Sequence, residues 1–433
     1  MKREAYSISV KELAELGPDK VPNELVSAKH LIYNSPAALA FNSPGAEGFG
    51  VKRAALCIPG SVMLLIGPDC CGRNTSFLNA PEGYGNRFFY YSMDETDIVT
   101  GRHLTLIPQA VSEILACLPE RPSVVILCVT CVDALLGTDM DRVCRKAAEA
   151  CHIPVVPCYM YALTREGRKP PMVDVRCTIY SLLEKQERDS RTVNILGYFA
   201  PLRPTSELYD ILRQLGLRHI NEVSRCQSFA EYKAMSRANF NLLLYPDVRL
   251  AAQAMEEKLG IPSIELTRLY QVDKIHNQYL ALAQVLGGTI DDGKWLAETR
   301  SLVRRTRERY AGTRIAIGET VNGSPFELAL ALTRFGFRVV SLFATPTADQ
   351  YAWLDGLAAL SPDTRVYSNL SPTMLYYRNE DQAVDVTLGR DAAYYYPDSA
   401  HVHWNEDLQP FGYDGVMTLL QALADALERR SRP

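Results

Sequence analysis

Short apolar runs alternate with amphipathic stretches along most of the chain after residue 60. In the first third, the apolar runs have the length and residue types of buried strands. The strands predicted there are Val62–Ile66, Arg87–Tyr91, Val124–Cys128 and Ile153–Cys158, and residues 139–151 have the period of a helix. Strands that alternate with helices in this way favour parallel, doubly wound sheets.

Two further series of the same kind follow. The second is predicted to have strands at 192–199, 240–245 and 261–266, with helices at 250–259 and 291–310. The third is predicted to have strands at 314–319, 338–343, 364–368 and 384–388, with helices at 325–335 and 415–430. We therefore predict an α/β fold of three Rossmann-like doubly wound parallel-sheet domains, residues 1–190, 191–310 and 311–433. Ligands of such domains bind at the carboxyl ends of the strands, here predicted to face a central crevice.

Composition narrows the functional class without naming it. A net charge of −4 over 433 residues argues against a nucleic-acid-binding protein, which usually carries a basic face. No apolar run approaches the roughly 18 residues of a membrane span, and the first residues lack the apolar core of a signal peptide. We expect a cytoplasmic protein with no nucleic-acid or membrane partner.

The cysteines are concentrated in the first third of the predicted fold. Ten of the eleven lie between Cys57 and Cys177, which argues for a shared task in that region. Cys71 follows the predicted strand Val62–Ile66 and a Gly-Pro turn. Cys131 follows the predicted strand Val124–Cys128. The carboxyl ends of parallel strands meet at one edge of a sheet, so these two thiols can converge on one metal cluster. A helix beginning at either cysteine would favour the thiolate form that binds iron.

Other cysteines around this pattern are weaker candidates. Cys70 adjoins Cys71 but points elsewhere, Cys128 lies inside a strand and reads as a core residue, and Cys57 is ambiguous. Cys128 and Cys131 form a C-x-x-C pair, but a structural zinc site needs a second such pair or two histidines nearby. We rank an iron–sulfur site first, zinc second and a redox dithiol third.

Three motifs in this order resemble the component 1 subunits of the nitrogenase superfamily, which also includes relatives in chlorophyll, factor F430 and sulfur metabolism. They are Gly67-Pro-Asp-Cys-Cys71, Glu95-Thr-Asp-Ile-Val-Thr-Gly101 and Thr130-Cys-Val-Asp-Ala-Leu-Leu-Gly-Thr-Asp139. Segments 240–245, 255–262, 403–404 and 412–415 resemble later parts of the same family. The resemblance extends over nearly the whole chain.

The resemblance implies that Cys71 and Cys131 ligate a [4Fe–4S] cluster at the interface with a homologous or identical subunit. Two cysteines from each subunit would supply the four ligands that such a cluster usually takes. It also implies a separate ATP-dependent iron–sulfur reductase as electron donor, docking near 72–76 and 133–139. The chain itself has no phosphate-binding loop of the G-x-x-x-x-G-K-[ST] type and no G-x-G-x-x-G.

The chain also departs from the family pattern. Residues 41–47 lack the upstream cysteine of the family, which favours a [4Fe–4S] cluster over an eight-iron one. The cysteine that holds the iron–molybdenum cofactor in nitrogenase falls here at Leu244 or Tyr245, and its histidine partner falls near His401 or His403. These departures argue against nitrogen fixation. The crevice is instead expected to hold a tetrapyrrole or another metallocofactor, near His401, His403, Tyr245 and Glu319.

Three functions remain open at this point. The first is the catalytic subunit of a nitrogenase-like oxidoreductase, which works without oxygen and passes electrons through the cluster to a substrate. The second is a scaffold for cofactor assembly, and the third is a partner subunit with no turnover of its own.

Overall fold

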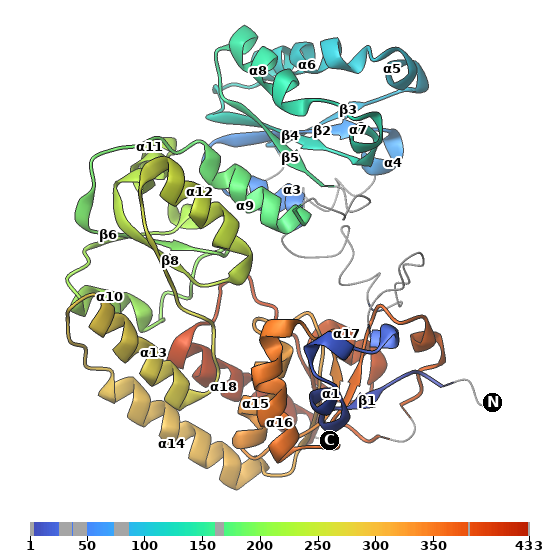
Figure 1. The fold of residues 1–433 in the computed structure, drawn as a ribbon, viewed down its shortest axis with the longest axis vertical. Helices are drawn as coiled ribbons and strands as arrows, with labels where there is room; N and C mark the ends of the chain where they lie inside the picture. The colour runs from blue at the N-terminus through green and yellow to red at the C-terminus, as the bar shows by residue number, and fades with distance from the viewer. Residues whose placement is uncertain are drawn as a thin grey trace. The chain divides into compact units, whose positions relative to one another are not determined.

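The structure, a computed structural model, describes residues 4–25, 37, 50–72, 86–160, 169–379 and 382–431. They fall into two compact units. The cysteine-bearing unit comprises residues 47–201 and 217–267, and the C-terminal unit comprises residues 1–46, 202–216 and 268–433. Figure 1 shows the elements of each unit.

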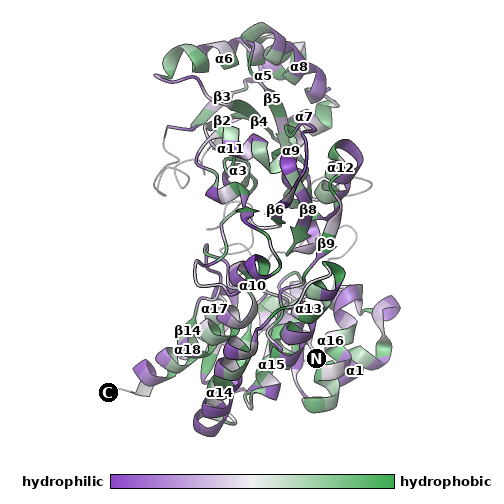
Figure 2. Ribbon diagram, turned by 90° about the vertical axis from the view of Figure 1, so that its left-hand side faces the viewer, coloured by the Kyte–Doolittle hydropathy of each residue, from purple (hydrophilic) through white to green (hydrophobic). Residues whose placement is uncertain are grey.

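The first sheet of the cysteine-bearing unit has four parallel strands in the order β3-β2-β4-β5. They are β2 (Ser61–Gly67), β3 (Phe88–Ser92), β4 (Val124–Val129) and β5 (Val155–Tyr159). Its helices are α3 (Val51–Ala55), α4 (Asp69–Gly72), α5 (Glu95–Thr100), α6 (His103–Cys117), α7 (Cys131–Leu136), α8 (Met140–Cys151) and α9 (Pro171–Ser181). Both faces are covered: one packs against α6 and α8, the other against α3 and α9. Covering on both faces explains why β2 and β4 are apolar at nearly every position, as Figure 2 shows by colour.

The second sheet of this unit repeats the arrangement in the order β7-β6-β8-β9, again all parallel. Its strands are β6 (Asp189–Leu196), β7 (His219–Asn221), β8 (Ala238–Leu243) and β9 (Ser263–Glu265), and its helices include α11 (Phe229–Ala234) and α12 (Arg249–Leu259). Helices α9 and α12 pack together, and one apolar core runs through residues of both sheets.

The C-terminal unit contains a six-stranded sheet in the order β1-β12-β11-β10-β13-β14. The strands are β1 (Ile8–Ser9), β10 (Arg314–Ile317), β11 (Arg338–Phe343), β12 (Arg365–Tyr367), β13 (Val386–Leu388) and β14 (Ala400–Val402). The helices are α1 (Val10–Leu16), α10 (Leu208–Gln214), α13 (Val272–Val285), α14 (Gly293–Tyr310), α15 (Pro325–Arg334), α16 (Tyr351–Leu360), α17 (Arg390–Tyr395) and α18 (Gly412–Ser431). All pairs are parallel except β1 with β12.

The predicted fold class is confirmed, because apart from the edge strand β1 all three sheets consist of parallel strands joined through helices. The charged stretch 291–310 is helix α14, drawn largely in the hydrophilic colour of Figure 2. Three short strands, β1, β7 and β14, were not predicted. Strand β1 pairs Ile8 with Val366, so the first residues of the chain belong to the last sheet. The division into three domains stays a prediction.

Glu327, in the first turn of α15, makes the stability of the C-terminal unit depend on pH. Glu327 is fully buried and accepts hydrogen bonds from the backbone N–H groups of Tyr270 and Gln271. Burial nevertheless raises the pKa of this carboxyl to about 7. A raised folded-state pKa gives stability that is complete at low pH and is lost as the pH rises through about 7.

We therefore expect the free energy of unfolding to fall by about 1 kcal/mol between pH 6 and pH 8 through Glu327. All three tryptophans of the chain, Trp295, Trp353 and Trp404, lie in the C-terminal unit. Urea unfolding followed by tryptophan fluorescence therefore reports on this unit. The fall should be absent from Glu327→Gln, and an equal fall in that variant would contradict the assignment.

Candidate metal centre

The sheet topology creates one switch point in each sheet, where the chain leaves two adjacent strands in opposite directions. Ligands of open α/β sheets bind outside the carboxyl ends of the strands at such points. The switch points lie between β2 and β4, between β6 and β8, and between β10 and β13. Four of the residues predicted from sequence, Cys71, Cys131, Tyr245 and Glu319, lie at these places.

Cys71 and Cys131 both belong to the first switch point. Register pairs Ile66 with Val129, so the two strands end side by side. Cys71 then lies on α4 and Cys131 is the first residue of α7, and both are partly exposed. The approach is close enough to require glycine at 67, since an added Cβ there would lie 2.8 Å from Thr130 Cγ2 and 3.3 Å from Cys71 Cβ.

The other predicted cysteines are placed differently. Cys57 comes before β2, at the amino end of a strand of 7 residues, and is thus roughly 20 Å along the strand from the edge with Cys71. Burial raises the pKa of the Cys57 thiol to about 12, which disfavours the thiolate. Cys128 is wholly buried in β4 opposite Cys158, and a hydrogen bond with Cys128, together with burial, raises the pKa of the Cys158 thiol. These positions favour core roles; the side chain of Cys70 lies outside the described residues.

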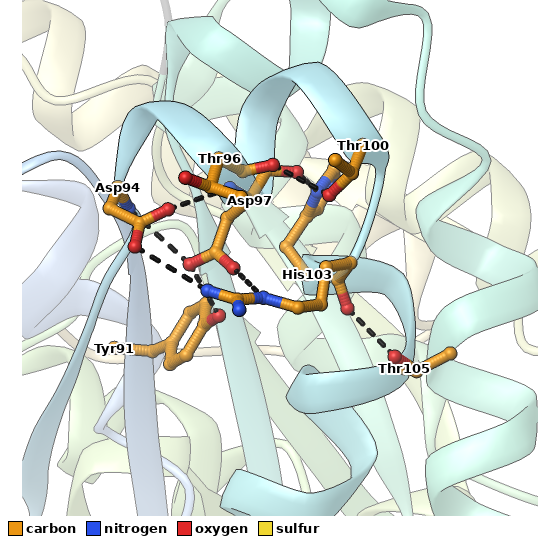
Figure 3. A network of polar contacts seen from close by, with 8 residues as sticks. Tyr91, Asp94, Thr96, Asp97, Thr100, His103 and Thr105 are labelled. Carbon is orange, nitrogen blue, oxygen red and sulfur yellow. Dashed lines mark hydrogen bonds and ion pairs between the residues drawn. The ribbon is translucent and has the colours of Figure 1, made fainter.

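A polar network fixes the loop between β3 and α6 beside the same edge (Figure 3). Asp94 caps α5 by accepting from the Asp97 N–H at 2.7 Å. The Asp97 carboxylate accepts from Tyr91 Oη at 2.9 Å and from Arg102 Nε at 2.7 Å. The motif residues Asp94 and Asp97 therefore act within the fold, by holding α5 in place.

His103 joins this network to the helix that carries Cys131. Its Nδ1 lies 3.0 Å from the carbonyl oxygen of Asp97, and its Nε2 lies 3.5 Å from Asp133 Oδ1 on α7. Both side chains are almost completely buried. Burial raises the pKa of the Asp133 carboxyl. Sequence analysis missed this pair, because nothing in the spacing of residues 103 and 133 signals a contact.

Tyr245 lies at the second switch point, directly after the carboxyl end of β8. The backbone approaches Gly197 so closely that a Cβ there would lie 2.9 Å from Tyr245 N. The buried guanidinium of Arg176 lies 5.0 Å from the Tyr245 ring centroid and 4.4 Å from that of Phe199. Arg176 also donates to the carbonyl oxygen of Gly197 at 3.0 Å. An aromatic side chain, more than a third exposed, is thus held over a buried cation.

Glu319 lies at the third switch point, and His401 and His403 lie on the neighbouring strand β14 and just beyond it. The wholly buried Asp391 organises this edge. Its carboxyl group accepts from Glu319 N and Thr320 Oγ1, both at 2.7 Å, and from Asn369 Nδ2 at 2.9 Å. Asp391 was not predicted, although the glycines at 318 and 389 that make room for it are visible in the sequence.

The two histidines at this edge both have a lowered pKa. His401 is exposed, with Nδ1 3.3 Å from Thr387 Oγ1, and His403 is half-buried, with Nδ1 3.4 Å from an Arg390 Nη. Burial lowers the pKa of both, and the charge of Arg390 lowers each further. Neutral imidazole is the form that binds metals or accepts a proton.

Within the described residues, no three side chains of histidine, cysteine, aspartate or glutamate gather closely enough to hold a metal ion. A four-thiolate cluster at Cys71 and Cys131 would therefore need ligands from outside this part of the chain. No helix of the described residues is long and apolar enough to cross a membrane.

Comparison with known proteins agrees with the order of motifs and with the fold. The sequence model of the nitrogenase component 1 type oxidoreductases matches residues 47–428. The chain belongs to this family. It is 28% identical to the nitrogenase iron-molybdenum cofactor biosynthesis protein NifE of Nostoc over 233 residues, 52% of this chain and 48% of that protein. It is 27% identical to NifE of Clostridium pasteurianum over 346 residues, 75% of this chain and 73% of that protein.

Solved structures show the same fold. The structure of nitrogenase Cp1 at pH 6.5 superposes with a TM-score of 0.70 at 16% identity, over 95% of this chain and 97% of that one. The resemblance inferred from three sequence motifs is thus confirmed at the level of family and fold. Membership also associates the chain with iron–sulfur chemistry, since the family is one of metal-cluster oxidoreductases and their assembly proteins.

Proposed function

We propose that this chain is the cluster-bearing component 1 subunit of a nitrogenase-like reductase. Cys71 and Cys131 would supply two of the four thiolates of a [4Fe–4S] cluster, and the same pair of a homologous or identical subunit would supply the others. The observation that supports this most is the placement of both cysteines at one switch point, beside a glycine whose missing side chain brings the two strand ends together. When bound, the cluster supplies a one-electron carrier at this edge.

The residues present fit such a group. Both cysteines are partly exposed at a sheet edge, as ligands shared between subunits must be, whereas Cys128, Cys144 and Cys158 are buried. The absence of a third nearby ligand in the described residues is compatible with a cluster completed by a second chain.

The electron donor is proposed to be an ATP-dependent iron–sulfur reductase that docks on α5 and α7. Both helices follow strands of the first sheet at the edge that carries the cysteines. Val99 on α5 is 85% exposed and Leu135 on α7 is 73% exposed, an unusual exposure for branched aliphatic side chains. The acidic Glu95 and Asp139 near the same helices are also exposed, which suits a partner with a basic rim.

Replacing Leu135 with Asp is expected to slow electron transfer from the reductase at least tenfold, because a charge would interrupt the apolar contact. Cluster content and unfolding midpoint should not change, since the side chain is mostly in solvent. Stopped-flow oxidation of the reductase measures the effect. Leu360→Asp is the matched control: Leu360 is 53% exposed on α16 of the other unit. Equal rates in the two variants would remove α7 from the docking surface.

At the substrate end, we propose that His401, His403 and Glu319 of the C-terminal unit contact an organic substrate such as a tetrapyrrole, or a second metallocofactor. Neutral imidazoles at positions 401 and 403 can ligate a metal or accept a proton, while Asp391 fixes the backbone of Glu319. Leu244 is buried and Tyr245 offers a phenol instead of a thiol, which argues against an iron–molybdenum cofactor held through this segment.

A scaffold for cofactor assembly is the second candidate, favoured by the NifE proteins among the relatives. Anaerobic purification followed by iron, sulfide and low-temperature EPR measurements before and after dithionite tests both. A stable cluster that is reduced by the reductase with ATP, and reoxidised by a substrate, supports the catalytic role. A cluster that leaves the protein for an acceptor apoprotein supports the scaffold. No iron after reconstitution would contradict both and favour a partner subunit without turnover.

A further inference from the structure

A buried hydroxyl without a partner lies at the first switch point. Thr130 follows β4 and precedes Cys131, and the residue is only 1% exposed. Its Oγ1 has no hydrogen-bond partner among the described residues. Hydroxyl groups inside proteins are normally paired, because an unpaired one has given up its bonds to water without replacement. A threonine hydroxyl in this state is available to an acceptor that forms when a nearby group becomes negatively charged.

The position of the hydroxyl points to the sulfur of Cys71. An ideal Cβ built on Gly67 would lie 2.9 Å from Thr130 Oγ1 and 3.3 Å from Cys71 Cβ. The hydroxyl and the cysteine therefore flank the same point above Gly67, one from each strand end. The two side chains can approach this point because residue 67 has no side chain.

We infer that the Thr130 hydroxyl donates a hydrogen bond to the Cys71 sulfur when that sulfur is negatively charged, as a free thiolate or as a cluster ligand. Hydrogen bonds to ionised acceptors are stronger than those to neutral ones, so the bond favours thiolate over thiol. Donors to ligand sulfur also stabilise the reduced, more negative state of an iron–sulfur cluster and so raise its potential. Thr130 is thus a positioning residue that tunes Cys71. The part of this inference that concerns the cluster rests on the proposed function.

Cys128 and Val129 precede Thr130 in the chain and are wholly buried, and Asp133 Oδ1 lies 3.5 Å from His103 Nε2. The hydroxyl of Thr130 is a side-chain donor that the geometry sets beside Cys71.

Two variants separate the hydroxyl from the shape of the side chain. Thr130→Val keeps the volume and removes the donor, and Thr130→Ser keeps the donor and removes a methyl group. In full-length protein free of iron, the rate of Cys71 alkylation by iodoacetamide at pH 7 is measured by peptide mass spectrometry. We expect it to fall at least threefold in Thr130→Val and to stay near the wild-type rate in Thr130→Ser. The exposed Cys117 serves as an internal reference whose rate should not change.

In the reconstituted protein, EPR titration with dithionite gives the ratio of reduced to oxidised cluster at a fixed potential. We expect a tenfold lower ratio in Thr130→Val, equivalent to about 59 mV for a one-electron couple, and no change in Thr130→Ser. If Thr130→Val has the same Cys71 alkylation rate and the same ratio of reduced to oxidised cluster as the wild-type protein, the inference is overturned. Slower alkylation in a protein that never takes up iron would uphold the bond to the thiolate and contradict the proposed function, so the two failures are distinguishable.

Discussion

Replacing Cys131 with Ala is expected to abolish the iron–sulfur absorption of the anaerobically purified protein. Cys131 is the first residue of α7 and follows β4 after one residue, so the end of the strand and the start of the helix fix its position. The nearest cysteine in sequence, Cys128, is wholly buried in the strand. In a dimer with one shared cluster, the change removes two of four thiolates. Iron should fall from about four atoms per dimer to background.

Cys117→Ala is the matched control for this experiment. Cys117 is an exposed cysteine at the end of α6, and its loss should leave iron content and the EPR signal unchanged. Cys128→Ala adds a second comparison: it should retain the cluster and lose only some stability through a small cavity in the core. Unchanged iron in Cys131→Ala would sink the ligand assignment, and iron loss in Cys128→Ala would show that the strand cysteine is a ligand.

The elements that carry the cysteines could be predicted from the sequence because their signals are local. Continuous apolar runs such as Val124–Cys128 have few alternatives to a strand covered on both faces, and the structure extends that strand by one residue, to Val129. A strand followed by a cysteine also fixes the edge at which the thiol lies. These two facts predict that Cys71 and Cys131 lie at the carboxyl edge of one sheet. The observed strand order then places both at one switch point.

What could not be predicted depends on contacts between residues far apart in the chain. Strand β14 has only three residues, and it is a strand because Thr387 and Leu388 offer it a pairing edge. The contact between His103 and Asp133, and the orphaned hydroxyl of Thr130, likewise depend on how two chain segments meet. Asp391 is the clearest case: its partners Glu319, Thr320 and Asn369 come from two other segments.

Asp391→Ala is therefore expected to destabilise the C-terminal unit by about 3–5 kcal/mol. The change would leave the N–H of Glu319, the hydroxyl of Thr320 and the amide of Asn369 without their acceptor in a fully buried place. The Asn369 amide is itself held by Tyr395, whose hydroxyl donates to Asn369 Oδ1 at 3.0 Å, so the loss extends to α17. Urea unfolding followed by tryptophan fluorescence measures the effect, since all three tryptophans belong to this unit.

The exposed Asp398 provides the control, and Asp398→Ala should change the unfolding free energy by less than about 0.5 kcal/mol. Asp391→Asn should fall between the two, because its amide oxygen still accepts at one position while its NH₂ group faces the donors at the other, either Thr320 Oγ1 or the Glu319 N–H and the Asn369 amide. An unfolding midpoint of Asp391→Ala equal to the wild-type value would show that water replaces the carboxyl group. The predicted loss of unfolding free energy would instead mean that Asp391 holds the backbone at the third switch point rigid. Glu319 is then presented by a fixed backbone, which is what a residue that contacts substrate requires.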